Sequence, residues 1–365
     1  MLLELPLFIE VDHLTEPAAT TEQKKKEPFL SKRQYGIVGA TFLFTFVLLV
    51  YIFLTPFSSG GEVVKISVHE GESFSGLLVK LEEQGIVSST FLAKVSGFLV
   101  GADRRLMPGV YRIPKDVSYI SLMSVFASKD FDPPKTLDLY SGITINGIAN
   151  RFKQAGIDSA DRFRRLLFDS STAASYGIPA INFEGYLLPV PISVLSTDAP
   201  EKVIKRLFDM NSAMFTDDLL DAIRKRGMSK HEVLTLASII SRESRYADEM
   251  PRISGVYHNR LKKGMKLQAD PTVQYAIGEL RNRITGKDLR VESPYNTYRY
   301  EGLPPGPIGN PSKEAILAAV YPEKHDFIYF VADTKGRHIF TKTYEEHMKY
   351  ARQYHQWLDS LDITR

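Results

Sequence analysis

The chain has 365 residues, 44% of them hydrophobic, and is long enough for two domains with hydrophobic cores of their own. Its 46 basic and 43 acidic residues give a net charge of +3, so the composition gives no reason to expect a nucleic-acid partner. The absence of cysteine excludes disulfides and thiolate metal sites, and the eight histidines show no HExxH-like spacing, so we expect no metal and no cofactor.

The first predicted element is a single transmembrane helix at residues 35–57, after a tail of residues 1–34. Its sequence, YGIVGATFLFTFVLLVYIFLTPF, contains no charge and is long enough to cross about 30 Å of hydrocarbon. Basic residues are concentrated before it, and the first one after it is Lys65. This bias predicts a cytoplasmic tail and an extracytoplasmic remainder from about residue 60. A cleaved signal peptide is a weaker alternative, because the apolar run is too long and no A-x-A site follows it.

A weak internal repeat follows a Ser/Gly linker. Residues 70–88 (EGESFSGLLVKLEEQGIVS) align with residues 141–159 (SGITINGIANRFKQAGIDS), with glycines at matching positions. Each copy predicts a strand, a turn at the first glycine and a helix that ends at the third glycine, with a second helix after it. We expect an α+β fold in which residues 62–135 form a small module and residues 136–365 form the next domain. The module could bind sugar or act only as a spacer.

A helix with an unusual carboxylate is predicted to begin at Ser229, which has the spacing of a capping box with Glu232. Within the following LTLASIISRES, one face of about 100° of arc carries Leu236, Ile239, Ile240 and Glu243. A carboxylate in the middle of an apolar stripe must find a partner or stay protonated.

Two interpretations of Glu243 are open. In the structural one it pairs with an arginine, for which the candidates are Arg242, Arg245 and Arg260. In the functional one it is a general acid whose pKa is raised by an apolar pocket, as in a glycosidase.

Polar and aromatic residues that could contact a sugar lie around this helix. They come from a bend in NFEGYLLP, from a loop approached by the strand-like MKLQADPT, and from the long Pro/Gly-rich loop at residues 293–312. Long loops inside compact domains are usually functional, and tyrosines and amides suit a sugar-binding cleft, although a rigid surface turn is an equal alternative. The candidates are Glu184, Tyr186, Gln268, Asp270, Thr272, Tyr295, Asn296 and Tyr298. The chain is predicted to end in a hairpin turning at Lys335–Gly336 and a helix from about Tyr344.

A single catalytic carboxyl limits the chemistry. Sugar hydrolysis normally uses two carboxylates, whereas one suffices when the substrate supplies its own nucleophile. Lytic cleavage of peptidoglycan is of this kind, because it closes a 1,6-anhydro ring on N-acetylmuramic acid without water. A membrane-anchored, extracytoplasmic domain suits that substrate.

Five blocks stand in one order between about Val63 and Tyr350: EGYLLP, LTLASIISRES, VYHNRLKKGMKLQADPTVQYAIG, SPYNTYRYEGLPPGPIGNPS and IYFVADTKGRHIFTKTYEEH. In them the chain resembles the MltG-type (YceG-like) endolytic murein transglycosylases. The resemblance implies a single-pass protein of the bacterial inner membrane, with a LysM-like module followed by a catalytic domain. It also implies internal cleavage of nascent glycan strands, which terminates their growth near the peptidoglycan synthases, the expected protein partners.

The chain departs from that family's pattern in two places. The family's helix reads like ASIIEKE, whereas here Ser241 stands at the first glutamate and Glu243 at the second. The resemblance therefore implies Glu243 as the catalytic acid, and position 241 lies about 160° away around the helix. After EGYLLP the family continues with Asp-Thr-Tyr, where this chain has residues 190–192, VPI. The residues that match the family blocks are Gln268, Asp270, Tyr295 and Asn296.

Three functions are carried forward. The first is an endolytic transglycosylase with Glu243 as acid and then base. The second is a non-catalytic peptidoglycan-binding scaffold of the cell-wall synthesis machinery, which an arginine pair at Glu243 would favour. The third is ordinary hydrolysis, which needs a second carboxylate such as Glu184 or Asp270.

Overall fold

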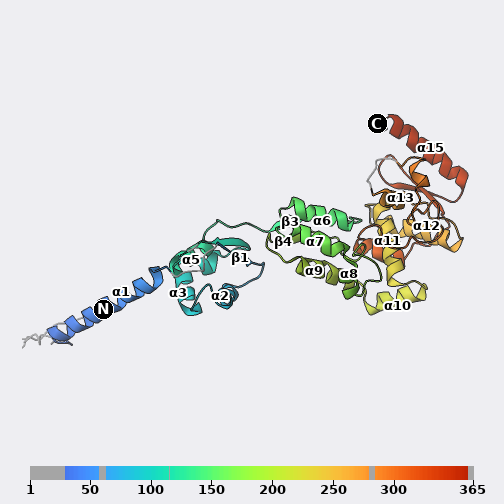
Figure 1. Cartoon of the computed structure of the whole chain (residues 1–365). Helices are drawn as coiled ribbons and strands as arrows, with labels where there is room; N and C mark the ends of the chain where they lie inside the picture. The colour runs from blue at the N-terminus through green and yellow to red at the C-terminus, as the bar shows by residue number, and fades with distance from the viewer. Residues whose placement is uncertain (1–28, 57–62, 115, 279–283, 361–365) are drawn as a thin grey trace, which may run out of the picture. The chain divides into compact units, whose positions relative to one another are not determined.

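The computed structural model describes residues 29–56, 63–114, 116–278 and 284–360, and contacts within the chain divide it into two compact units, Met1–Thr55 and Pro56–Arg365 (Figure 1). The described part of the first unit, residues 29–55, contains one helix, α1 (Lys32–Leu54), which begins before the predicted span because Ser31 and Gln34 form a capping box. Among the described residues α1 is the one helix long and apolar enough to cross a membrane, and none of its residues is buried. Its orientation stays a prediction.

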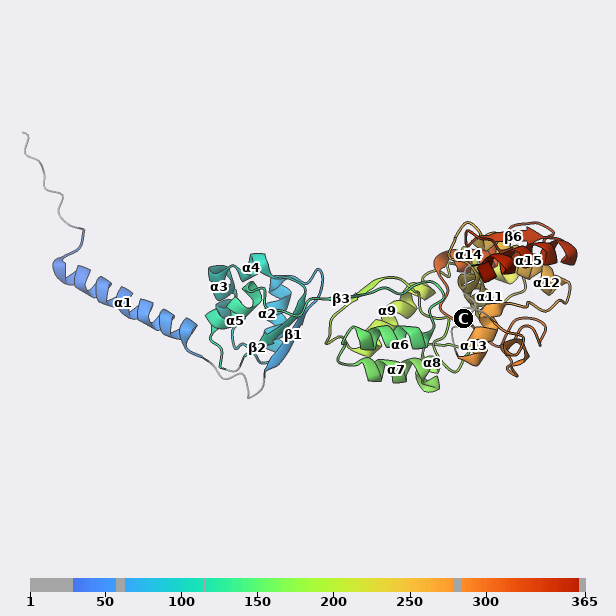
Figure 2. The same ribbon diagram turned by 90° about the horizontal axis from the view of Figure 1, so that it is seen from above.

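The second unit begins with a small helical layer packed on two strands, and we call residues 63–132 the N-terminal module. Strands β1 and β2 pair antiparallel (Figure 2), with Ile66 opposite Tyr111. The ring of Tyr111 packs 5.0 Å from the ring of Phe126. The strand and the two helices predicted for the first copy of the repeat are present as β1 (Val64–Val68), α2 (Phe74–Glu83) and α3 (Thr90–Val100). The module also contains α4 (Ala102–Arg105), β2 (Gly109–Ile113) and α5 (Tyr119–Ala127).

The internal repeat is confirmed as a structural repeat. Its second copy consists of β3 (Lys135–Leu137), α6 (Ile145–Gln154) and α7 (Ala160–Phe168), which correspond to β1, α2 and α3. The paired glycines adopt nearly the same left-handed conformation, with φ of 78° and 81° before the first helix and 68° in both copies after it. Left-handed φ is where glycine is favoured, so the shared glycines fix the same turn and helix end in each copy.

The long helix α11 (Lys230–Glu243) is the centre of the C-terminal half of the described chain. Nine consecutive α11 residues from Val233 to Ser241 are buried, and α11 packs against α10, α12, α13 and α14. The hairpin and terminal helix are confirmed. The other elements are α8 (Ser170–Ser175), β4 (Ile192–Val194), α9 (Pro200–Ser212), α10 (Asp217–Lys225), α12 (Met250–Lys262), α13 (Asp270–Ile277), a 3₁₀ turn (Asp288–Arg290), α14 (Lys313–Val320), β5 (Tyr329–Ala332), β6 (His338–Thr341) and α15 (Tyr344–Ser360).

The structure is a mixed α and β fold, in which β3 pairs with β4 and β5 with β6, both antiparallel. The main hydrophobic core is built from residues between Leu137 and Val320. The predicted boundary at residues 135–136 and the LysM-like nature of the module stay predictions. One local prediction is wrong: residues 265–269 pair with no strand among the described residues, and Asp270 begins α13 instead of lying in a loop.

Candidate active site

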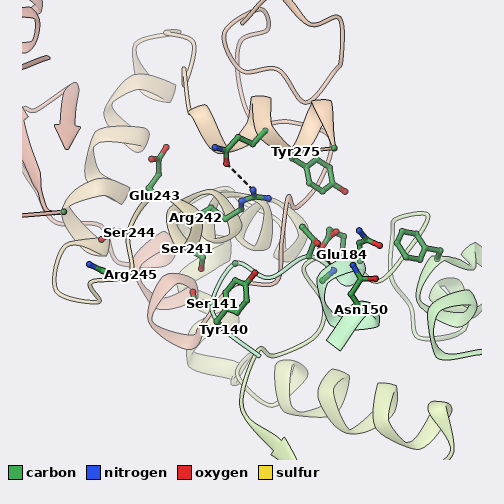
Figure 3. A pocket seen from close by; sticks show the side chains of 18 residues that line it. Tyr140, Ser141, Asn150, Glu184, Ser241, Arg242, Glu243, Ser244, Arg245 and Tyr275 are labelled. Carbon is green, nitrogen blue, oxygen red and sulfur yellow. Dashed lines mark hydrogen bonds between the residues drawn. The ribbon is translucent and has the colours of Figure 1, made fainter. Parts of the chain in front are cut away.

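A cavity of about 800 Å³ opens where α11 ends (Figure 3). It is lined by the loop before α6 and by α6 itself, by Glu184, by residues 241–245 at the end of α11, by α13, and by Gly336 of the β5–β6 turn. Segments from five parts of the chain therefore meet at the carboxylate that the sequence singled out.

Close backbone packing brings the loop before α6 against α11. Gly142 has φ of 81°, and a side chain there would place its Cβ 2.8 Å from Cγ of Arg242. The Gly142 N–H donates to the carbonyl of Asn310 at 2.8 Å. Only glycine allows this approach without strain, so the residue contributes to the wall of the cavity through its backbone.

Asn310 holds two of the lining segments together, the loop before α6 and the segment that carries Glu184. It is fully buried, and its Oδ1 accepts from the N–H groups of Gly185 and Leu187, both at 3.0 Å. Its Nδ2 donates to the carbonyl of Ile143 at 2.9 Å and to Oε1 of Glu184 at 3.3 Å. One amide therefore satisfies donors and acceptors on both sides of the cavity wall.

Glu243 is the last residue of α11, and Ser244 after it is extended. The residue lines the cavity, while its carboxyl group is largely enclosed by protein. Burial raises the pKa of Glu243 to about 7, a hydrogen bond from Tyr257 opposes that rise, nearby Asp270 adds to it, and Arg242 opposes it. At neutral pH the group therefore exists both protonated and ionised, as a general acid that must later act as a base requires.

Tyr257 sets the orientation of that carboxyl. Its hydroxyl donates to Oε1 of Glu243 at 2.5 Å, and its ring is buried edge-on against Phe330, with ring centroids 5.8 Å apart. Burial raises the pKa of Tyr257 well above 10, so the phenol stays a donor throughout the physiological range. With Oε1 occupied as an acceptor, the Glu243 proton is left to Oε2.

The arginine pair considered for Glu243 is absent among the described residues. In Figure 3 the Arg242 side chain lies between Glu243 and Glu184, and its guanidinium donates to the Ile308 carbonyl at 2.9 Å. Arg260 donates to the carbonyls of residues 266 and 328 and to Oε1 of Gln268. Arg245 lies over the ring of Tyr246. The condition that would have favoured a scaffold is therefore not met.

Glu184 is a second carboxyl in the same cavity. It is 5% exposed, and its Oε1 accepts from the Ile145 N–H at 3.0 Å. Burial raises its pKa to about 8, although the Ile145 hydrogen bond and the charge of Arg242 both oppose the rise. Near pH 7 Glu184 is thus mainly a neutral acid, which makes it a poor base for activating water.

Asp270 and Tyr298 lie near Glu243, whereas Gln268 accepts a hydrogen bond from Arg260; none of the three is among the described residues that line the cavity. The Tyr298 hydroxyl donates to Oδ1 of Asp270 at 2.5 Å, and both residues interact electrostatically with Glu243. They can tune the acid. Tyr295 lies behind the wall, with its ring 4.9 Å from the ring of Tyr275, which does line the cavity.

Three predicted sugar contacts, Tyr186, Thr272 and Asn296, are not among the described residues that line this cavity, and their polar atoms make internal hydrogen bonds, so sugar contact by them stays a prediction. Tyr186 shares a 2.7 Å hydrogen bond with Nδ1 of His231. Thr272 donates to the Ala269 carbonyl at 2.6 Å. Asn296 donates to the carbonyls of residues 289 and 291, at 3.0 and 2.9 Å, and so holds its own loop in shape.

The structure also describes the two positions at which the sequence departs from the family pattern, Ser241 and residues 190–192. Ser241 is buried at the cavity edge, and its Oγ accepts from the Ser312 N–H at 3.3 Å. Residues 190–192 lead into β4. Sequence reasoning missed Tyr257, Tyr275 and Asn310; for Tyr257 the signal was available, since it places a hydroxyl on the apolar side of a helix, as Glu243 places a carboxyl.

Comparisons with known proteins identify the family. A sequence model of the YceG-like family matches residues 66–353. An endolytic murein transglycosylase of Bacillus subtilis is 40% identical over 172 residues, 47% of this chain and 48% of that protein. One of Streptococcus pneumoniae is 27% identical over 359 residues, 83% of this chain and 64% of that protein. The chain thus spans less than two thirds of either relative.

A solved structure of a related protein has a similar fold. The crystal structure of a YceG-like protein from Listeria monocytogenes superposes with a TM-score of 0.54 at 31% identity, covering 80% of this chain and 99% of that one. Because the family model matches well over half of the sequence, the chain belongs to the YceG-like family.

Proposed function

We propose that this protein is an endolytic murein transglycosylase, which cleaves the MurNAc–GlcNAc bond within nascent peptidoglycan strands and leaves 1,6-anhydro-MurNAc ends. The observation that carries the proposal is Glu243, a cavity-lining carboxyl with a pKa of about 7 and no arginine partner among the described residues. The names of the curated relatives, endolytic murein transglycosylases, support the same reaction.

In the first half of the reaction Glu243 acts as the acid. Its proton, on Oε2, passes to the glycosidic oxygen as the bond from C1 of MurNAc to that oxygen breaks, and GlcNAc leaves with a free hydroxyl. Tyr257 stays bonded to Oε1 and stabilises the carboxylate that forms, because it is a donor already in place before charge develops.

In the second half the same group acts as the base. The C6 hydroxyl of MurNAc attacks C1, its proton passes to the Glu243 carboxylate, and the 1,6-anhydro ring closes without water. The acid is regenerated, so one carboxyl with a pKa near the working pH suffices for both steps. Arg242 faces the cavity between the two carboxyls and can hold a polar group of the sugar.

The topology proposed with this activity is a single membrane span at α1, a cytoplasmic N-terminus and a catalytic unit outside the plasma membrane. Five basic residues precede the uncharged stretch at residues 35–57, in keeping with that orientation: Lys24, Lys25, Lys26, Lys32 and Arg33. Anchoring would place the cavity close to strands emerging from membrane-bound synthases, where internal cleavage terminates their growth.

The test uses the full chain and un-crosslinked nascent glycan strands, with strand ends identified by mass spectrometry. The matched variants are Glu243→Gln and Glu232→Gln; Glu232 is an exposed carboxyl on the same helix, and glutamine preserves its capping role. We expect 1,6-anhydro ends from wild type and Glu232→Gln, and none from Glu243→Gln.

The other outcomes separate the alternatives. Reducing ends in place of anhydro ends would refute the lytic step and indicate hydrolysis, with Glu184→Gln and Asp270→Asn then distinguishing the second carboxyl. Binding of strands without cleavage by wild type would favour the non-catalytic scaffold.

A further inference from the structure

Helix α3 of the N-terminal module exposes a continuous apolar stripe. Phe91, Phe98 and Leu99 are 71%, 56% and 69% exposed. At 100° per residue these three share about 100° of arc with Val95, so they form one face and not scattered positions. We call Phe91, Val95, Phe98 and Leu99 the α3 face.

Helix α3 packs on the rest of the module through the side opposite the α3 face. Ala93, Ser96 and Gly97 are buried there, and α3 contacts α2, α4 and α5. A Cβ added at Gly97 would lie 2.2 Å from the Phe74 ring, so the helix sits as close to the module core as its backbone allows. Burial in the module therefore does not explain why large apolar side chains occupy the outer face, and such patches mark interaction surfaces.

Basic side chains lie on α3 and on the short helix that follows it. Lys94 lies next to Phe98 on the helix surface, and α4 adds Arg104 and Arg105 directly after α3. The Arg104 side chain is 86% exposed, with Asp103 at 3.8 Å as its ion-pair partner. Met107, directly after α4, is also exposed. Phenylalanine and leucine flanked by lysine and arginine are typical of helices that lie in a membrane interface.

The chain length between α1 and the module makes a membrane the appropriate occupant. Nine residues, 55–63, separate the end of α1 from the start of β1, and a chain of that length spans at most about 30 Å. A domain of about 70 residues has a radius of gyration of about 11 Å. Any face of the module is therefore within reach of the bilayer that α1 crosses, at a high effective concentration.

We propose that the α3 face inserts into the interfacial region of the membrane that α1 spans, with Lys94, Arg104 and Arg105 at the level of the lipid headgroups. The proposal rests on α1 as a membrane span and is independent of the lytic chemistry. Its consequence is that the module lies on the lipid surface as a second point of attachment and limits how far the catalytic unit extends from the membrane.

The test exploits the absence of cysteine from the chain. The full chain is reconstituted in nanodiscs of phosphatidylglycerol and phosphatidylcholine, with an environment-sensitive NBD fluorophore attached through Phe98→Cys, or through Phe91→Cys as an independent site. The matched control is Arg112→Cys, because Arg112 is the exposed residue of β2 and points to the side of the strand opposite the buried Tyr111 and Ile113. Doxyl-labelled phosphatidylcholine serves as the quencher.

We expect blue-shifted emission and several-fold stronger quenching at positions 98 and 91 than at position 112, with less quenching when phosphatidylglycerol is omitted. Water-like emission at both α3 positions would overturn the proposal. Blue-shifted emission that spin-labelled lipid does not quench would also overturn it, and would assign the α3 face to a second copy of the chain. Activity plays no part in the readout, so failure here is distinguishable from failure of the proposed reaction.

Discussion

Removing one hydroxyl should move the pH dependence of cleavage upward. The change is Tyr257→Phe, which keeps the buried ring against Phe330 and deletes only the hydrogen bond to Oε1 of Glu243. That bond stabilises the ionised carboxylate and therefore lowers the pKa of Glu243. Because the first step needs the protonated acid, wild-type activity should decline as pH rises through about 7.

The size of the shift follows from the strength of the bond. A hydrogen bond to a charged group contributes about 1.5–3 kcal/mol, and one pKa unit corresponds to about 1.4 kcal/mol, so the alkaline limb should move up by roughly one to two pH units. Asp270→Asn should move the alkaline limb in the opposite direction. The negative charge of Asp270 raises the pKa of Glu243, so removing that charge should move the limb to lower pH.

The assay measures initial rates of 1,6-anhydro end formation by wild type and both variants from pH 5 to 9.5. Tyr186→Phe is the control for loss of a buried tyrosine hydroxyl, since that hydroxyl bonds His231 and not the acid. An unchanged limb in Tyr257→Phe, or a shift of the same sign in both variants, would refute Glu243 as the titrating group.

Three further changes test how the cavity is built. Glu184→Gln keeps an acceptor for Ile145 and removes the buried ionisable group, so thermal unfolding from pH 5 to 8 should become less pH-dependent than in wild type. Asn310→Ala leaves the N–H groups of Gly185 and Leu187 buried without acceptors, at about 1–3 kcal/mol each, which urea unfolding should register. Gly142→Ala forces a side chain into left-handed φ and against Arg242; we expect a loss of about 1–3 kcal/mol and slower cleavage, and wild-type behaviour would contradict the close approach.

Much of the fold could be predicted because local rules determine it. The capping box at Ser229, the paired glycines of the repeat and the turn at Lys335–Gly336 each act over a few residues, and all appear in the structure. The stretch at residues 265–269 was misjudged because its alternating pattern resembles a strand but it finds no partner strand among the described residues. Strand pairing is a long-range property that the pattern alone does not contain.

The same distinction between local and long-range interactions applies to the site. Glu243 could be found from the sequence because a carboxyl on an apolar helical face is a local contradiction, and such contradictions mark functional sites. Thr272 and Asn296 donate to backbone carbonyls of their own region instead of lining the cavity, because polar residues near long loops often satisfy the backbone of those loops. Asn310 was missed for the converse reason: its partners lie more than 120 residues away in sequence, and only the folded chain brings them together.

The two carboxyls of the cavity lower the stability of the fold as pH rises. Both pKa values are raised above the ordinary 4.5, to about 8 for Glu184 and about 7 for Glu243, so the folded chain holds these protons more tightly than the unfolded chain does. Stability is therefore greatest below about pH 4.5 and is lost as pH rises toward 7 and 8, by about 1.4 kcal/mol for each unit of raised pKa. A glutamine at 184 would relieve most of that loss while keeping the hydrogen bond from Ile145. If Glu184→Gln gains stability near pH 8 and loses cleavage, the second carboxyl acts in the reaction; if it gains stability and cleaves as before, Glu243 alone carries the proton.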